Sequence, residues 1–201
     1  MIDRLRLYLV ADPDHCRGSL VDAIGAALSG GVTAVQLRAK NLEDRGVAAL
    51  GRRIRELTAS HDALYIVNDR VDIALATSAD GVHLGVTDLH PEDLRRIAPP
   101  GFIIGYSPDD ESDAAGAGTC DYYGIGPVFG TASKADAGDA LGLDAFGTRV
   151  ERSPVPVIGI GGIDASNAAS VVDRGAAGVA VISAILGAPA PLQATRKLHR
   201  S

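Results

Sequence analysis

The sequence predicts an α/β fold, a single (β/α)8 TIM barrel that spans residues 1–201. Short apolar runs alternate with segments of helical period along the whole chain, as is typical of parallel strands joined by crossover helices. The residues are 46% hydrophobic and only 4% aromatic, and 24 are glycine, which is an α/β composition. Eight such units without an obvious linker favour a closed barrel, with an open doubly wound sheet as the alternative.

Eight strands are expected where β-branched and apolar runs are bounded by turn residues. They are predicted at Leu5–Val10, Ala34–Leu37, Leu64–Val67, Gly81–Leu84, Phe102–Gly105, Tyr122–Ile125, Val155–Ile160 and Gly178–Ile182. Helices predicted between them include Leu20–Ser29, Leu42–Ser60, Pro91–Ile97, Asp109–Ala117 and Ser166–Arg174. Good cap or first-turn residues precede or begin three of these helices, namely Asp164, Pro91 and Asp109.

Charge and cysteine content exclude several classes of protein. A formal net charge of -6 argues against a broad surface for nucleic acid or anionic membranes, because either needs massed Lys and Arg. Since no apolar run reaches the ~20 residues needed to span a bilayer, we expect a cytoplasmic protein without a membrane partner. Cys16 and Cys120 form no CxxC pair and are expected to be reduced thiols without a catalytic role.

Three polar side chains alternate along the second predicted strand and its extension. Gln36, Arg38 and Lys40 share one face because strand side chains alternate with period two. In an edge strand this face would be solvated, but in a closed barrel it points toward the mouth at the strand's carboxyl end. The pattern therefore predicts an anion clamp.

Polar residues also end the next two strands. Asn68 and Asp69 follow the third strand and Asp88 follows the fourth, so the two carboxylates can share one cation. Beside a basic clamp they predict Mg²⁺ bridging a diphosphate, and the alternative is that they cap the helices that follow. His83, inside the fourth strand, is expected to be a packed, hydrogen-bonded histidine rather than a ligand or base.

The last two strands are followed by small residues. Gly161-Gly162 follows the seventh strand and Ile182-Ser183 the eighth, where barrels commonly bind phosphate through backbone N–H groups, although paired glycines also make tight turns. The connection 126–142 is longer than the usual βα loop of about two to six residues. It is expected to be a lid over bound phosphates or a solvated loop, and its candidate groups are Thr131, Ser133 and Lys134.

Sequence motifs follow one another in a fixed order along nearly the whole chain. They are LYLVAD, VQLRAK, VNDRVDIALATSADGVHLGVTDL, GYS, YYGIGPVFGTASK and VIGIGGIDASNAASVVDRGAAGVAVISAI. At these spacings the series resembles the thiamine-phosphate synthase family. The resemblance implies a transferase of thiamine biosynthesis that joins 4-amino-2-methyl-5-hydroxymethylpyrimidine diphosphate to 4-methyl-5-(2-hydroxyethyl)thiazole phosphate, giving thiamine phosphate and diphosphate. It also implies Mg²⁺ as cofactor, small phosphorylated molecules as partners and a possible homodimer.

The resemblance further implies a role for each matching residue. The contacts to the pyrimidine diphosphate would be Gln36, Arg38, Lys40, Asn68, Ser107 and Lys134, and the catalytic groups among them would be Arg38, Lys40, Ser107 and Lys134. The ligands of Mg²⁺ would be Asp69 and Asp88. The thiazole phosphate would be bound by Thr131, Ser133, Gly162, Ile182 and Ser183. Positioning and electrostatic stabilisation of a departing diphosphate would then suffice, without a strong general base.

The sequence departs from the family pattern at three places, one of which is the short stretch between Gly142 and Pro154. Pro108-Asp109-Asp110 stands where a Thr-His pair is common, and Gly130 and Ser133 replace Pro and Thr. These changes bear on loop packing and substrate affinity rather than on the reaction, because the charged groups remain. A related thiazole tautomerase, which would need a basic histidine near Ser107, and a barrel that binds a phosphorylated ligand without catalysis are the alternatives.

Overall fold

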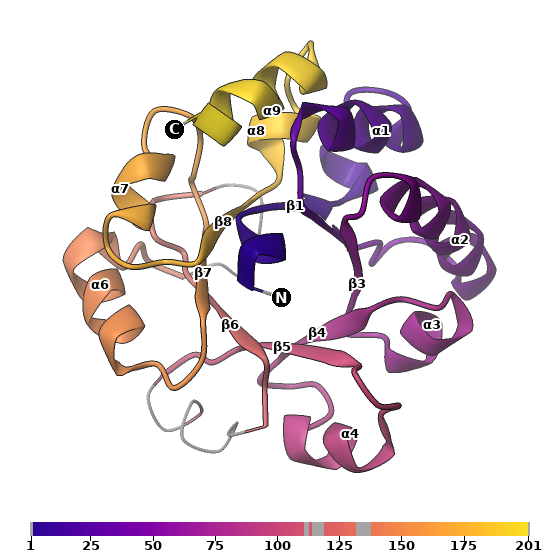
Figure 1. Ribbon diagram of the computed structural model, residues 1–201, viewed down its shortest axis with the longest axis horizontal. Helices are drawn as coiled ribbons and strands as arrows, with labels where there is room; N and C mark the ends of the chain where they lie inside the picture. The colour runs from indigo at the N-terminus through magenta and orange to yellow at the C-terminus, as the bar shows by residue number, and fades with distance from the viewer. Residues whose placement is uncertain (1, 111–112, 114–118, 132–137, 201) are drawn as a thin grey trace.

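Eight parallel strands close into a barrel in chain order, and β8 pairs with β1. The computed structural model describes residues 2–110, 113, 119–131 and 138–200. The ring of strands lies inside a ring of helices (Figure 1), which confirms the predicted closed barrel. The strands are Leu7–Ala11 (β1), Ala34–Leu37 (β2), Leu64–Asn68 (β3), Gly81–Gly85 (β4), Ile103–Ser107 (β5), Tyr122–Ile125 (β6), Val157–Ile160 (β7) and Gly178–Val181 (β8).

The helices cover the outside of the barrel. They are Leu20–Gly30 (α1), Asp44–Ser60 (α2), Val71–Ala76 (α3), Pro91–Ile97 (α4), Gly142–Arg152 (α6), Ala168–Val172 (α7), Ser183–Leu186 (α8) and Pro191–Arg200 (α9), with short 3-10 helices at Ile2–Leu5 (η1) and Pro13–His15 (η2). The helix predicted at Asp109–Ala117 falls mostly outside the described residues. Within the part of the chain that the structure describes, no helix is long and apolar enough to cross a membrane.

Some predicted boundaries differ from the observed ones for identifiable reasons. The strand β7 begins at Val157 rather than Val155, because Pro156 has no N–H to join the ladder. Leu5 belongs to η1, so β1 begins only at Leu7. The helix predicted at Ser166–Arg174 is shorter, since the Asp164 side chain instead stabilises a turn by accepting a hydrogen bond from the Ser166 N–H at 2.8 Å.

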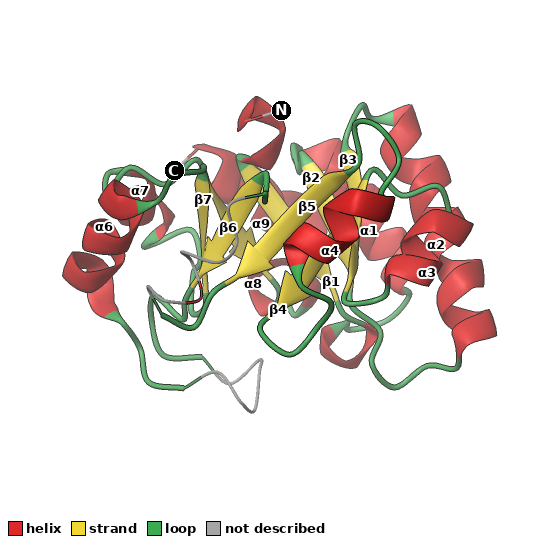
Figure 2. Ribbon diagram, turned by 90° about the horizontal axis from the view of Figure 1, so that it is seen from below, coloured by secondary structure: helices red, strands yellow, loops and turns green. Residues whose placement is uncertain are grey.

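Apolar side chains form two layers, as the period of two in each strand requires. One layer fills the barrel interior and includes Tyr8, Ala34, Ile66 and Tyr122. The other lies between the strands and the helices. The arrows in Figure 2 run away from η1, which lies at the amino-terminal end of the barrel, toward the loops that follow the strands.

Side chains at the amino-terminal end tie neighbouring strands together. The residues directly before β2, β4 and β6 each accept a hydrogen bond from a backbone N–H of the preceding strand. The pairs are Thr33 with Leu7 (3.1 Å), Asp80 with Tyr65 (2.7 Å) and Asp121 with Ile104 (2.7 Å). This end of the barrel therefore contributes to stability, and the carboxyl end is left for a site.

Candidate active site

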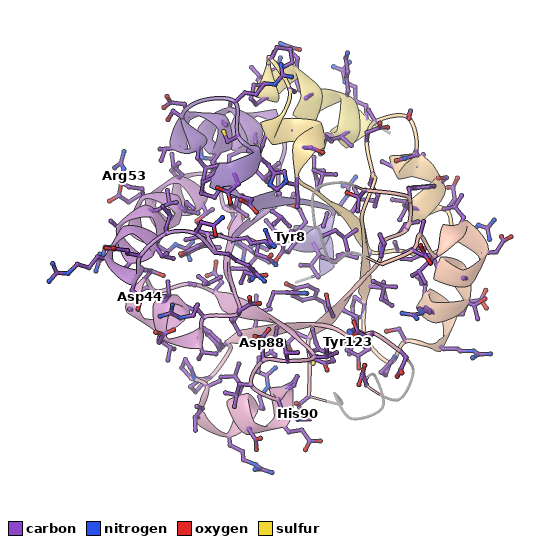
Figure 3. The ribbon with its side chains drawn as sticks, turned by 180° about the vertical axis from the view of Figure 1, so that it is seen from behind. Tyr8, Asp44, Arg53, Asp88, His90 and Tyr123 are labelled. Carbon is purple, nitrogen blue, oxygen red and sulfur yellow. The ribbon has the colours of Figure 1, made fainter. Side chains whose placement is uncertain are left out.

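A cavity of about 1040 Å³ opens at the carboxyl end of the strands. Its wall includes residues from all eight strands, and Figure 3, seen from behind the view of Figure 1, shows Tyr8 inside the ring. The predicted site residues that line it are Gln36, Arg38, Lys40, Asn68, Asp69, Asp88, Ser107, Thr131, Gly162, Ile182 and Ser183. The other two, Ser133 and Lys134, lie outside the described residues.

The three side chains of the expected clamp reach the cavity, and each has a partner. Gln36 is buried and donates from Nε2 to the Tyr8 hydroxyl at 3.0 Å. Arg38 forms an ion pair with the buried carboxylate of Asp12. The Nζ of Lys40 lies 3.7 Å from Oδ2 of Asp69. Arg38 and Lys40 therefore place two cations next to the carboxylates of Asp12 and Asp69, where a diphosphate could be held.

Asp12 was not among the predicted site residues. Its side chain is only 2% exposed, and a buried carboxylate needs a cation partner, which here is Arg38. It also accepts a hydrogen bond from the Asp14 N–H at 3.0 Å. The only sequence signal for Asp12 as a site residue is the period of two that also marked the clamp, because Tyr8, Val10 and Asp12 alternate in the same way.

Asp69 and Asp88 come together at the ends of β3 and β4. Burial and then the neighbouring Asp88 carboxylate raise the pKa of Asp69, while Lys40 and Arg38 act in the opposite direction. Oδ2 of Asp88 is oriented by the N–H of Gly85 at 2.7 Å. Two carboxylates that repel one another in this way form a site whose charge favours a cation.

The alternative that these two residues cap helices is wrong. Arg70 occupies the N-cap position of α3, and His90 caps α4 with its own side chain. Among the described residues, no group of three or more His, Cys, Asp and Glu side chains could hold a metal ion. A pair of carboxylates fits Mg²⁺ nevertheless, because this ion usually takes one or two protein carboxylates and completes its shell with phosphate oxygens and water.

The glycine pair after β7 lies at the cavity and lets a neighbouring loop approach closely. Gly161 and Gly162 have φ values of 97° and 64°, in the left-handed region that favours glycine. A Cβ at Gly162 would lie 2.6 Å from the carbonyl oxygen of Gly130, so the pair also lets the loop after β6 approach closely. Gly162 lines the cavity together with Ser183, the first residue of α8.

His83 and Ser107 both line the cavity. Nε2 of His83 is 2.8 Å from Oγ of Ser107, and Nδ1 is 3.1 Å from the Tyr122 hydroxyl. The prediction of a packed, hydrogen-bonded histidine is thus confirmed. A histidine does stand beside Ser107, although residues 108–110 supply none, but both of its ring nitrogens already have hydrogen-bond partners.

The fold and this cavity define a class of protein, a (β/α)8-barrel enzyme with cationic and backbone groups for anionic ligands at its carboxyl end. Residues 7–185 match the thiamine monophosphate synthase family. A thiamine-phosphate synthase of Roseiflexus sp. is 47% identical over 90% of this chain and 78% of its own length. Another, of Methanoculleus marisnigri, is 45% identical over 96% of this chain and 93% of its own length.

A solved structure is similar over almost the whole fold. The thiamine phosphate pyrophosphorylase of Pyrococcus furiosus superposes with a TM-score of 0.90 at 40% identity, covering 99% of this chain and 96% of that one. The chain therefore belongs to the thiamine-phosphate synthase family, and it is a transferase of thiamine biosynthesis. Two of these relatives are named thiamine-phosphate synthase and the third thiamine phosphate pyrophosphorylase, which favours the synthase over the tautomerase and the non-catalytic barrel.

Proposed function

We propose that this barrel joins 4-amino-2-methyl-5-hydroxymethylpyrimidine diphosphate to 4-methyl-5-(2-hydroxyethyl)thiazole phosphate, with Mg²⁺ as cofactor. One observation carries the proposal: a single cavity has groups suited to anions on two sides. The clamp and the carboxylate pair follow β2, β3 and β4, whereas the glycine pair and Ser183 follow β7 and β8. Two phosphorylated substrates can therefore be held in one space.

The diphosphate would be bound on the clamp side. Arg38 and Lys40 supply positive charge there, and Asn68, which lines the same cavity, would add an amide. Asp69 and Asp88 would hold Mg²⁺, which would neutralise charge on the diphosphate as it leaves. The ion pair with Asp12 holds the Arg38 guanidinium in one place before substrate arrives. Lys134 would add a further charge from the loop after β6.

The thiazole phosphate would be bound on the other side. Backbone N–H groups near Gly162 and Ile182 and the hydroxyl of Ser183 are suited to a phosphate dianion. The hydroxyls of Thr131 and Ser133 would cover it from the loop after β6. This arrangement would point the thiazole nitrogen toward the pyrimidine methylene.

The chemistry asks for positioning and charge rather than for a strong base. The C–O bond between the pyrimidine methylene and the diphosphate breaks, and the amino-substituted ring spreads the positive charge that remains. The thiazole nitrogen then donates its electron pair to that methylene carbon, forming the C–N bond of thiamine phosphate. Because no proton is abstracted, the engagement of both nitrogens of His83 is compatible with this route.

Product analysis tests the proposal. Purified protein would be incubated with both substrates and Mg²⁺, with and without EDTA, and thiamine phosphate detected by mass spectrometry. We expect thiamine phosphate and one equivalent of diphosphate, and loss of both with EDTA. Folded protein that forms no product would contradict the proposal, and product formation unaffected by EDTA would contradict the metal assignment.

A further inference from the structure

Five polar side chains form a continuous hydrogen-bonded network across the barrel interior. It runs from Gln36 on β2 through Tyr8 on β1, Tyr122 on β6 and His83 on β4 to Ser107 on β5. The successive donor–acceptor distances are 3.0, 2.9, 3.1 and 2.8 Å. The two end residues are candidate substrate contacts, whereas the three in the middle have no part in the reaction proposed above.

The barrel makes room for this interior network with two glycines. A Cβ at Gly105 would overlap the Tyr122 ring and Nδ1 of His83. At Gly124 a Cβ would lie 3.0 Å from Cε1 of His83 and 3.1 Å from Oγ of Ser107. Any other residue at either position would therefore displace members of the network.

The buried tyrosines give the interior network a single direction. Tyr8 and Tyr122 are both 0% exposed, so their hydroxyl protons must find acceptors inside the barrel. Burial raises the pKa of both hydroxyls, and both stay protonated at neutral pH. Because the Tyr8 oxygen accepts a hydrogen bond from Gln36 Nε2, the Tyr8 hydroxyl donates to the Tyr122 oxygen, and the Tyr122 hydroxyl donates to Nδ1 of His83. With Nδ1 of His83 as an acceptor, the ring N–H lies at Nε2, which donates a hydrogen bond to Oγ of Ser107.

This direction fixes what each end offers to a ligand. Because Nε2 of Gln36 donates to Tyr8, the orientation of the amide is fixed, and its Oε1 is the acceptor that Gln36 can offer to a ligand. Ser107 accepts from His83 and so has its hydroxyl proton left to donate. Gln36 would therefore accept a hydrogen bond from an amino group on a ring, whereas an oxo group at the same ring position would meet another acceptor.

We propose that Tyr8, Tyr122 and His83 are positioning residues that fix the polarity of Gln36 and Ser107 and thereby select an aminopyrimidine over its oxo analogue. The identity of the ring rests on the proposed function. The fixed polarity rests on the hydrogen bonds of the interior network alone. A site built around such a fixed acceptor can discriminate strongly, because the wrong partner leaves buried polar groups unpaired.

Binding and turnover of two matched ligands test this selection. Calorimetry in Mg²⁺ would compare 4-amino-2-methyl-5-hydroxymethylpyrimidine diphosphate with the analogue that carries an oxo group in place of the 4-amino group. We expect Tyr8→Phe to reduce the ratio of the two affinities by about tenfold or more. Without the Tyr8 hydroxyl, the Gln36 amide can rotate so that Oε1 and Nε2 exchange places. The KM for thiazole phosphate should stay near that of the wild type, since that substrate binds away from Gln36.

Tyr65→Phe is the matched control. Tyr65 is another fully buried tyrosine, but its hydroxyl contacts Thr77 at 3.2 Å outside the barrel interior. This variant loses a comparable buried hydroxyl and should keep the wild-type affinity ratio within about twofold. If Tyr8→Phe does not fold, Tyr122→Phe removes the next link and should give the same reduction.

The outcomes separate this inference from the proposed function. A folded Tyr8→Phe or Tyr122→Phe protein with the wild-type affinity ratio would overturn the positioning role. A wild-type protein that prefers the amino ligand, and loses this preference on Tyr8→Phe, would support that role even if no thiamine phosphate formed. In that case the proposed reaction alone would be wrong.

Discussion

Replacement of Asp121 by alanine should destabilise the barrel without changing its chemistry. Oδ2 of Asp121 accepts hydrogen bonds from the Ile104 N–H at 2.7 Å and from Nη2 of Arg95 at 2.6 Å, so it joins β6 to β5 and to α4. A hydrogen bond to a charged group contributes about 1.5–3 kcal/mol, and the ion pair, whose side chains are 32% and 31% exposed, adds up to about 1 kcal/mol. We therefore expect Asp121→Ala to lower the free energy of unfolding by about 3 kcal/mol. For a domain of this size the melting temperature should fall by about 6–12 °C.

Thermal unfolding followed by circular dichroism measures this effect. Asp144→Ala is the control, because Asp144 pairs with Arg174 at 2.7 Å but its side chain is 94% exposed. Its melting temperature should change by less than about 2 °C. Both variants should keep wild-type kcat and KM well below their melting temperatures. A melting temperature of Asp121→Ala near that of the wild type, or a loss of kcat in the folded variant, would refute the division of the barrel into a stabilising and a functional end.

Four further predictions concern the cavity and the cysteines. Asp69→Asn should keep the fold, since asparagine tolerates the φ of 60° at this position, but should lower the rate of product formation by about 100-fold or more; a wild-type rate would remove Asp69 from the metal site. Arg38→Ala should raise the KM for the pyrimidine diphosphate by about tenfold. An unchanged KM in steady-state kinetics would exclude Arg38 from diphosphate binding. Ser183→Ala should raise the KM for thiazole phosphate by about three- to tenfold with little change in kcat, whereas a change confined to kcat would argue for another role. Burial raises the pKa of Cys120 to about 12, so iodoacetamide at pH 8 should modify it more slowly than Cys16 in the native protein, and equal rates by mass spectrometry would contradict that burial.

Local sequence patterns predicted the barrel, and together with the family resemblance they predicted part of the cavity wall. The strand Ala34–Leu37 has the same bounds in the structure. Gln36 on this strand and Arg38 and Lys40 directly after it all line the cavity, as the alternating pattern predicted. The boundary of β7 differs because Pro156 interrupts the ladder, an effect that the apolar pattern of the segment conceals. The placement of Ser133 and Lys134 stays a prediction.

Contacts between distant strands could not be predicted from the sequence. Asp12 and Arg38 are 26 residues apart, and their ion pair depends on the pairing of β1 with β2. Tyr8 and Tyr122 are 114 residues apart, so nothing in either segment indicates that their hydroxyls meet. Each of these pairs forms only when the barrel closes, because closure brings the inward faces of separate strands into one interior.

The central claim is that the diphosphate and the phosphate bind on two sides of one cavity. A crystal structure of the protein with Mn²⁺ in place of Mg²⁺, a pyrimidine diphosphate and thiazole phosphate would test it most directly, since anomalous scattering locates the cation. We expect the cation between Asp69 and Asp88, the diphosphate against Arg38, and the thiazole phosphate beside Gly162 and Ser183. Both ligands on the same side, or a cation bound away from the two carboxylates, would contradict the account.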